Sequence, residues 1–199
     1  MFRSERGFSL IEMLLVLAIM SVIAVMAVPM SGNALKYIRI SGDARDISNA
    51  LAVTKMRAAA KFTKARLFVD LSSNAYYIQT YDKTAGSWTS ESGSTSLSPS
   101  VALGYGTVAS PPSNTQSSIG QASACYNTAS PAVTIANTAC VVFNSRGIPI
   151  RGDTSASPTG DDAIYINDGT FVYGVTVAAT GFIRTWRTNY TTTPSWSQQ

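Results

Sequence analysis

The chain has 199 residues, of which 45% are apolar and 13% charged; it has no histidine and two cysteines. Without histidine, Ser-His-Asp and Cys-His catalysis are excluded, two cysteines cannot form a four-ligand zinc site, and we expect no enzyme, cofactor or metal ion. The formal net charge of +4 lies in residues 1–61, since residues 62–199 carry equal numbers of acidic and basic side chains, so no general attraction to nucleic acid is expected.

The first predicted element is a hydrophobic helix over residues 8–30, with Glu12 as its single charge. Roughly 20 apolar residues span a bilayer as a helix. Arg3 and Arg6 precede the segment, which places the amino terminus in the cytoplasm and the remainder outside. A plain membrane anchor, or a signal peptide cleaved near residues 25–27, would also fit this pattern. Glu12 argues against both of these interpretations. Placing a carboxylate in lipid costs roughly 2–3 kcal/mol, so such a residue normally has a partner.

The segment Arg6-Gly7-Phe8-Ser9-Leu10-Ile11-Glu12 resembles the signal of type IV pilins and type II secretion pseudopilins. The resemblance implies that a prepilin peptidase removes the leader 1–7 by cleaving after Gly7, and that the new terminal Phe8 is methylated. It further implies that Glu12 pairs with the amino terminus of a neighbouring subunit's Phe8, which removes two charges from lipid and fixes the helix register. Pro29 occupies a position where the family tends to carry proline.

A second helical pattern extends the first helix to residue 61. Its apolar residues recur at steps of three and four: Tyr37, Ile40, Ala44, Ile47, Leu51 and Ala58. This stripe predicts that the second half of the helix packs on a sheet, while its basic face is solvated or faces anionic lipid. Pro29 and Gly32 are expected to bend or loosen the helix between its halves.

From residue 62 the pattern becomes that of a β-rich head, 62–199. Turn signals stand at 72–74 and at Asn167-Asp168-Gly169. Residues 84–130, rich in small polar residues and proline, predict long loops with few short strands. Strands are predicted at 66–71, 75–81, 133–135, 140–143, 163–166, 171–177 and 182–187. The fold class is therefore α+β: a long amino-terminal transmembrane helix packed on an antiparallel β-sheet head, the pilin-like roll.

Cys125 and Cys140 are predicted to form a disulfide, since such pairs outside the cytoplasm usually do. Closing a loop of this size stabilises the fold by about 3 kcal/mol in the chain-entropy model. Two buried free thiols are the alternative. The disulfide would fasten the polar loop to a strand beginning at Cys140.

The acidic residues Asp153, Asp161 and Asp162 raise the question of a cation-binding loop. Clustered carboxylates suit Ca²⁺, but their spacing here matches no Ca²⁺ loop pattern. A solvated acidic turn is the better interpretation.

Two further segments, 142–149 and 175–184, resemble GspH/FimT-type minor pseudopilins. The resemblance implies a minor pilin or pseudopilin that primes or caps a type IV pilus or a type II secretion pseudopilus. The implied partners are other pilin or pseudopilin subunits, the prepilin peptidase and inner-membrane lipid. The implied location is the inner membrane, crossed once, with the head in the periplasm or on an extracellular filament.

Some FimT-type minor pilins bind DNA during natural transformation through Gly-Arg-x-Arg, which gives an alternative function. The matching stretch here is Gly181-Phe182-Ile183-Arg184, in which Phe182 replaces the first arginine. Arg187 follows, and the aromatic residues available to stack on bases are Trp186, Tyr190 and Trp196. Binding through Arg184 and Arg187 would be weak, with a log–log salt slope of about 2 on duplex DNA. Otherwise Phe182 and Trp186 face the core while Arg184 is solvated.

Overall fold

The computed structural model describes residues 9–91, 93–128, 132–152 and 156–199, excluding the side chains of residues 26–33. The chain divides into two compact units, residues 1–38 and 39–199. One helix, α1 (Leu10–Ala60), contributes to both units. Its backbone is helical through residues 29–32, so Pro29 and Gly32 do not interrupt it.

In the first unit, residues 10–25 of α1 are apolar except for Glu12 and Ser21. Over residues 10–25, the exposed fraction of the large apolar side chains runs from 45% at Val16 to 78% at Leu10. Within the described residues, no helix has both the length and the hydrophobicity needed to cross a membrane. The predicted span, 8–30, includes Phe8 and the side chains of residues 26–30, which lie outside the described residues.

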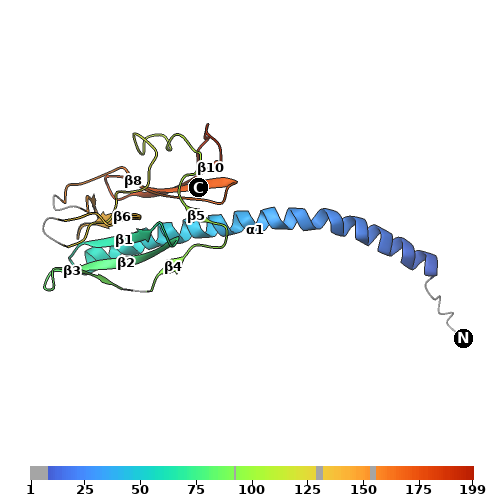
Figure 1. Ribbon diagram of the computed structural model, residues 1–199, viewed down its shortest axis with the longest axis horizontal. Coiled ribbons are helices and arrows are strands. Elements are labelled where there is room, and N and C mark those ends of the chain that lie inside the picture. Colours follow the sequence, from blue (N-terminus) through green and yellow to red (C-terminus); the bar gives the residue numbers. More distant parts are fainter. Residues whose placement is uncertain (1–8, 92, 129–131, 153–155) are drawn as a thin grey trace, which may run out of the picture. The chain divides into compact units, whose positions relative to one another are not determined.

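The second unit contains two antiparallel sheets where one was expected (Figure 1). The first has the order β3 (Ser87–Ser90), β2 (Ala75–Asp82), β1 (Ala65–Asp70), β6 (Thr138–Phe143) and β7 (Pro149–Ile150), with β4 (Thr95–Ser96) also on β2. The second has the order β11 (Ser197–Gln198), β10 (Ile183–Asn189), β9 (Phe171–Val177), β8 (Asp162–Asn167) and β5 (Ala102–Leu103).

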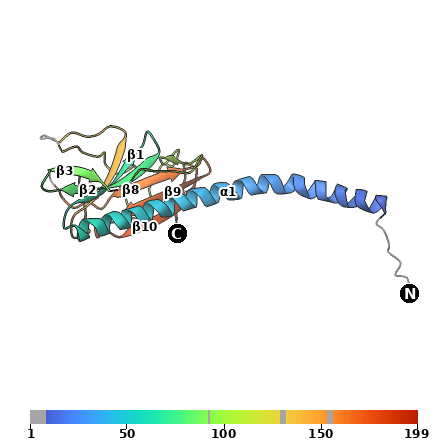
Figure 2. The same cartoon turned by 90° about the horizontal axis from the view of Figure 1, so that it is seen from below.

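The core forms where the second half of α1 meets the inner faces of both sheets (Figures 1 and 2). Along the predicted stripe, Ile40, Ala44, Ile47, Leu51 and Ala58 are at most 1% exposed. They pack with Leu67 and Phe143 of the first sheet and with Ile164 and Val175 of the second. The stripe is thus confirmed except at its first member, Tyr37, which is 38% exposed.

Both predicted hairpin turns are present. Asp70 accepts the backbone N–H groups of Ser72 and Ser73, and Asn74 adopts the left-handed conformation at φ 50°. Asp168 accepts the N–H groups of Thr170 and Phe171 in the turn from β8 to β9. These side-chain acceptors replace hydrogen bonds that the backbone cannot make within a tight turn.

The predicted strand at 133–135 was wrong. Thr134 forms a single bridge to Tyr126, and Ile135 donates its N–H to the carbonyl of Cys125. The sequence there has β propensity, but a ladder also needs a continuous partner strand.

Candidate functional site

Glu12 lies in the first turn of α1, where its carboxylate is favourably placed for the helix dipole. The carbonyl of Ser9 accepts the N–H groups of Glu12 and Met13 at 3.0 and 3.2 Å, which starts the helix. Glu12 is exposed and forms no ion pair with another described residue. Gly7 and Phe8, the predicted processing residues, lie outside the described residues, as does the side chain of Pro29.

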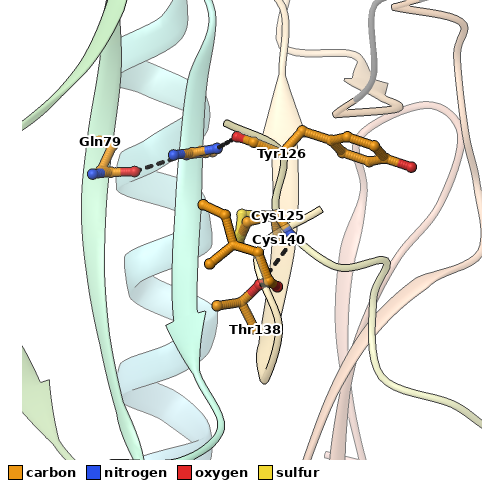
Figure 3. Close-up of a disulfide and its surroundings, with 7 residues drawn as sticks. Gln79, Cys125, Tyr126, Thr138 and Cys140 are labelled. Atoms are coloured by element: carbon orange, nitrogen blue, oxygen red, sulfur yellow. Dashed lines mark hydrogen bonds between the residues drawn. A yellow bond between two sulfur atoms is a disulfide. The ribbon is translucent and has the colours of Figure 1, made fainter. Parts of the chain in front are cut away.

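Cys125 and Cys140 form the predicted disulfide, with their Cα atoms 5.0 Å apart. Thr138 donates its hydroxyl to Ile135 O at 2.6 Å and accepts the Cys125 N–H at 3.0 Å, so the bridged loop is held at a second point (Figure 3). The strand that receives the loop begins at Thr138, two residues before the predicted start at Cys140.

Arg66 ties the same loop to β1 and was not singled out from the sequence. Its Nη1 donates to the carbonyl of Tyr126 at 2.7 Å, and its Nε donates to Gln79 Oε1 at 2.7 Å (Figure 3). The guanidinium lies 4.2 Å from the ring centroid of Trp88. Arg66 is 4% exposed, and burial lowers its pKa to about 10. The sequence signal was a single arginine inside the apolar run of β1.

The four predicted DNA-binding residues lie in or beside β10 but do not form one surface. In β10, Arg184 is paired with Thr176, Trp186 with Gly174 and Arg187 with Tyr173. Because side chains alternate along a strand, Arg184 and Trp186 share the outer face, whereas Arg187 projects from the inner face. Arg187 stacks on Phe171 at 5.1 Å, and Arg184 on Phe182 at 5.2 Å. The two arginines therefore do not form a single patch.

The expectation that Phe182 and Trp186 face the core was wrong. Phe182 precedes β10 and is 58% exposed. Trp186 lies on the outer face, where its Nε1–H donates to Thr176 Oγ1 at 2.9 Å. The two other predicted stacking aromatics, Tyr190 and Trp196, pack against an outer cluster formed by Val108, Ala163, Tyr165 and Val172.

Gly181 has a packing role at a junction of three segments. Lys55 of α1 donates to the carbonyl of Gly181 at 2.9 Å. The backbone of Gly181 has φ +75°, and a Cβ there would overlap the carbonyl oxygen of Gly147. A Cβ at Gly147, with φ +74°, would lie 2.8 Å from Lys55 Cε. The two glycines thus let α1, the β6–β7 turn and the β9–β10 hairpin meet closely.

We expect Gly181→Ala to lower the free energy of unfolding by about 1–3 kcal/mol, because it adds a strained positive φ and an overlap with backbone. Gly169→Ala is a matched control, since Gly169 also has positive φ but a Cβ added there would meet no neighbour within 4 Å. Denaturant unfolding of both variants checks this, and equal losses would show that the Gly147 contact contributes nothing.

Asp162 contradicts the interpretation of a solvated acidic turn. Its side chain is buried, with 6% of its surface exposed. Burial, reinforced by the charge of Asp161, raises the pKa of Asp162 to about 7, and Arg151 opposes this shift. Asp161 is exposed, whereas Asp153 lies outside the described residues. Among the described residues, no cluster of three metal-ligating side chains occurs.

Comparison with known protein families finds a match at the amino terminus. Residues 2–28 match the family model described as the prokaryotic N-terminal methylation motif. This motif is the prepilin-like signal of type IV pilin-like proteins, so the resemblance seen in the sequence is confirmed at that level. No curated protein and no solved structure matches the chain. The more specific assignment of the head to the GspH/FimT type stays a prediction.

Proposed function

We propose that this chain is a minor pilin or pseudopilin, a structural subunit that primes or caps a type IV pilus or a type II secretion pseudopilus. The observation that carries the proposal is the methylation motif over residues 2–28, within which the first part of α1, residues 10–25, has a single carboxylate, Glu12, among exposed apolar side chains. Type IV pilin-like proteins are structural subunits, so the chemistry of this chain is processing and assembly.

The apolar surface of residues 10–25 supports a role in packing. A helix that is hydrophobic on every side is stable only when lipid or other helices cover it. We propose that inner-membrane lipid covers residues 8–30 before assembly and that the helices of sibling subunits cover them afterwards. The paired sheets of residues 39–199 would then form the head, outside the cytoplasm, where the Cys125–Cys140 disulfide is stable.

We expect prepilin peptidase to remove residues 1–7 and the new terminal Phe8 to be methylated. The measurement is the intact mass of full-length protein extracted from membranes of cells with and without the peptidase. A mature terminus near Val28 would instead identify a secretory signal peptide. Deletion of the gene then distinguishes the two filament systems. Loss of pili would identify a type IV pilus, and loss of protein secretion would identify a type II secretion pseudopilus.

The alternative function, DNA binding through Arg184 and Arg187, gains no support from their arrangement. The two side chains project from opposite faces of β10, and each stacks on a phenylalanine. Gly181 is accounted for by its contact with Lys55 and Gly147. DNA binding at this motif therefore stays a prediction, tested by the Arg184→Ala/Arg187→Ala double variant.

A further inference from the structure

β3 is the longest of the strands that border the two sheets (Figure 1). The strands at the other margins, β5, β7 and β11, have two residues each, and β7 begins with Pro149. Short length and proline are devices that keep the edge of a sheet from pairing with another chain. β3 has four residues and contains neither proline nor a charged side chain. Among the described strands, β3 therefore offers the most accessible edge for a further strand.

The backbone of β3 is oriented so that alternate residues face away from β2. The N–H of Glu91 bonds to the carbonyl of Ile78. Hydrogen-bonded and non-hydrogen-bonded pairs alternate along an antiparallel ladder, so Thr89 also bonds to β2. Trp88 and Ser90 then direct their N–H and C=O groups toward the outer edge. Two residues thus present backbone donors and acceptors to a partner.

Contacts on the outer face of the first sheet hold β3 in its extended conformation. The ring of Trp88 meets the ring of Tyr81 edge to face, with centroids 5.4 Å apart, and the Arg66 guanidinium lies 4.2 Å from the Trp88 centroid. The hydroxyl of Ser90 accepts a hydrogen bond from Gln79 Nε2 at 3.2 Å. Because the strand is already ordered, little conformational entropy is lost when another segment pairs with it.

A groove of about 500 Å³ lies between β3 and α1. It is on the inner face of the first sheet, because Ile78 in its wall also packs against the core. The groove is lined by Val53, Arg57 and Lys61 of α1, by Ile78 and Thr80 of β2, and by residues 89–91. Alternate side chains of a strand added to β3 would project toward this groove. Pockets beside an edge strand select the side chains of the segment that binds there.

The charged residues of the groove carry a net positive charge. Arg57 and Lys61 both pair with the carboxylate of Glu91, which Arg57 Nε contacts at 3.0 Å. The side chains of Arg57 and Lys61 are 53% and 49% exposed, whereas that of Glu91 is 16% exposed. The guanidinium of Arg57 has N–H donors besides Nε, so it can bond to a second carboxylate. A second copy of β3 would bring a groove of like charge, whereas an acidic segment complements this one.

We propose that β3 is a docking edge for an extended segment of another protein, which pairs with Trp88 and Ser90 and places an acidic side chain in the groove beside Arg57. In this mode of recognition, main-chain hydrogen bonds provide the affinity and the groove provides the selectivity. The site lies on the head, so it does not depend on how residues 8–30 pack or on which filament the chain joins.

The test uses the full chain in a zwitterionic detergent at low salt and three blocked, fluorescein-labelled heptapeptides. The peptides alternate threonine and valine and differ only in a central glutamate, glutamine or lysine. We expect the glutamate peptide to bind about fivefold more tightly than the lysine peptide, a preference that shrinks as salt screens the groove. Arg57→Gln should reduce this preference without abolishing binding.

Hydrogen exchange of individual amides locates the bound peptide. At a concentration of glutamate peptide about ten times its Kd, exchange of the Trp88 and Ser90 amides should slow by about tenfold, because each N–H then has an acceptor. The Thr89 amide, which already bonds to β2, should change little. This measurement on the parent chain decides the proposal even if a variant fails to fold.

Ser90→Pro removes one outward N–H and leaves the N–H groups that bond to β2 in place. Proline is tolerated on an edge strand when its nitrogen faces solvent, so the variant should melt at nearly the temperature of the parent chain. It should bind the glutamate peptide about tenfold more weakly. Ser90→Ala is the matched control, because it loses the same contact with Gln79 but keeps the N–H, and it should bind like the parent.

Four results would overturn the proposal: no binding of any peptide, unchanged exchange of both amides, equal binding by a folded Ser90→Pro, or tighter binding of the lysine peptide. Dimerisation of the parent chain that Ser90→Pro abolishes would overturn the choice of an acidic segment and make a second copy of the chain the occupant.

Discussion

Glu12→Ala should be processed normally but enter filaments at a small fraction of the parent level. If Glu12 pairs with the amino terminus of a neighbouring Phe8, its removal leaves a positive charge without a partner in an apolar environment. Breaking a buried ion pair in this way costs roughly 3–5 kcal/mol, which is more than a hundredfold in an association constant. The exposed apolar side chains around Glu12 would supply that environment once helices pack.

The measurement compares the chain in membranes with the chain in sheared filaments or in complemented deletion cells. Glu12→Gln keeps the shape of the side chain without its charge, and should fail like the alanine variant. Ser21→Ala is the control, because Ser21 is also an exposed polar residue of this helical segment and its hydroxyl donates to Ala18 O of its own helix. Incorporation of Glu12→Ala at the parent level would remove the pairing role.

Asp162→Asn should stabilise the chain by about 4 kcal/mol above pH 7 and have little effect near pH 4. The pKa of Asp162 is raised from 3.8 to about 7 in the folded chain. The folded state therefore binds the proton more tightly than the unfolded state. The stability that this adds is fully present below about pH 4 and is lost as the pH rises to about 7. Asparagine stays neutral throughout and avoids the loss.

Denaturant unfolding of the full chain from pH 4 to pH 8 tests this prediction. The quantity to compare is the difference in the free energy of unfolding between Asp162→Asn and the parent chain at each pH. Asp161→Asn serves as the matched comparison, because Asp161 is exposed and its charge raises the pKa of its neighbour, while an asparagine oxygen can still accept the hydroxyl of Thr159. It should reduce the pH dependence without removing it. If the difference in the free energy of unfolding between Asp162→Asn and the parent stays constant with pH, Asp162 ionises normally in the folded chain.

Local sequence patterns determined several parts of the molecule. The processing signal depends on a short run of residue types, and its match over residues 2–28 requires no tertiary structure. The buried stripe of α1 follows from the helical repeat, and β9 has the predicted bounds, Phe171–Val177, because aromatic and β-branched residues there follow a strong turn. The disulfide was predicted from two cysteines in a segment expected to lie outside the cytoplasm.

Tertiary structure decided which residues share a surface. Arg184 and Arg187 were grouped because they are close in sequence, yet an odd separation along a strand places them on opposite faces of the second sheet. Asp162 was taken as solvated because acidic residues usually are, but its position at the start of β8 buries it. Lys83, beyond β2, donates to the carbonyl of Phe62 just after α1, a contact that only the packing of the first sheet brings about. Sequence periodicity specifies the face of each element, whereas long-range packing determines which faces meet water and which meet one another.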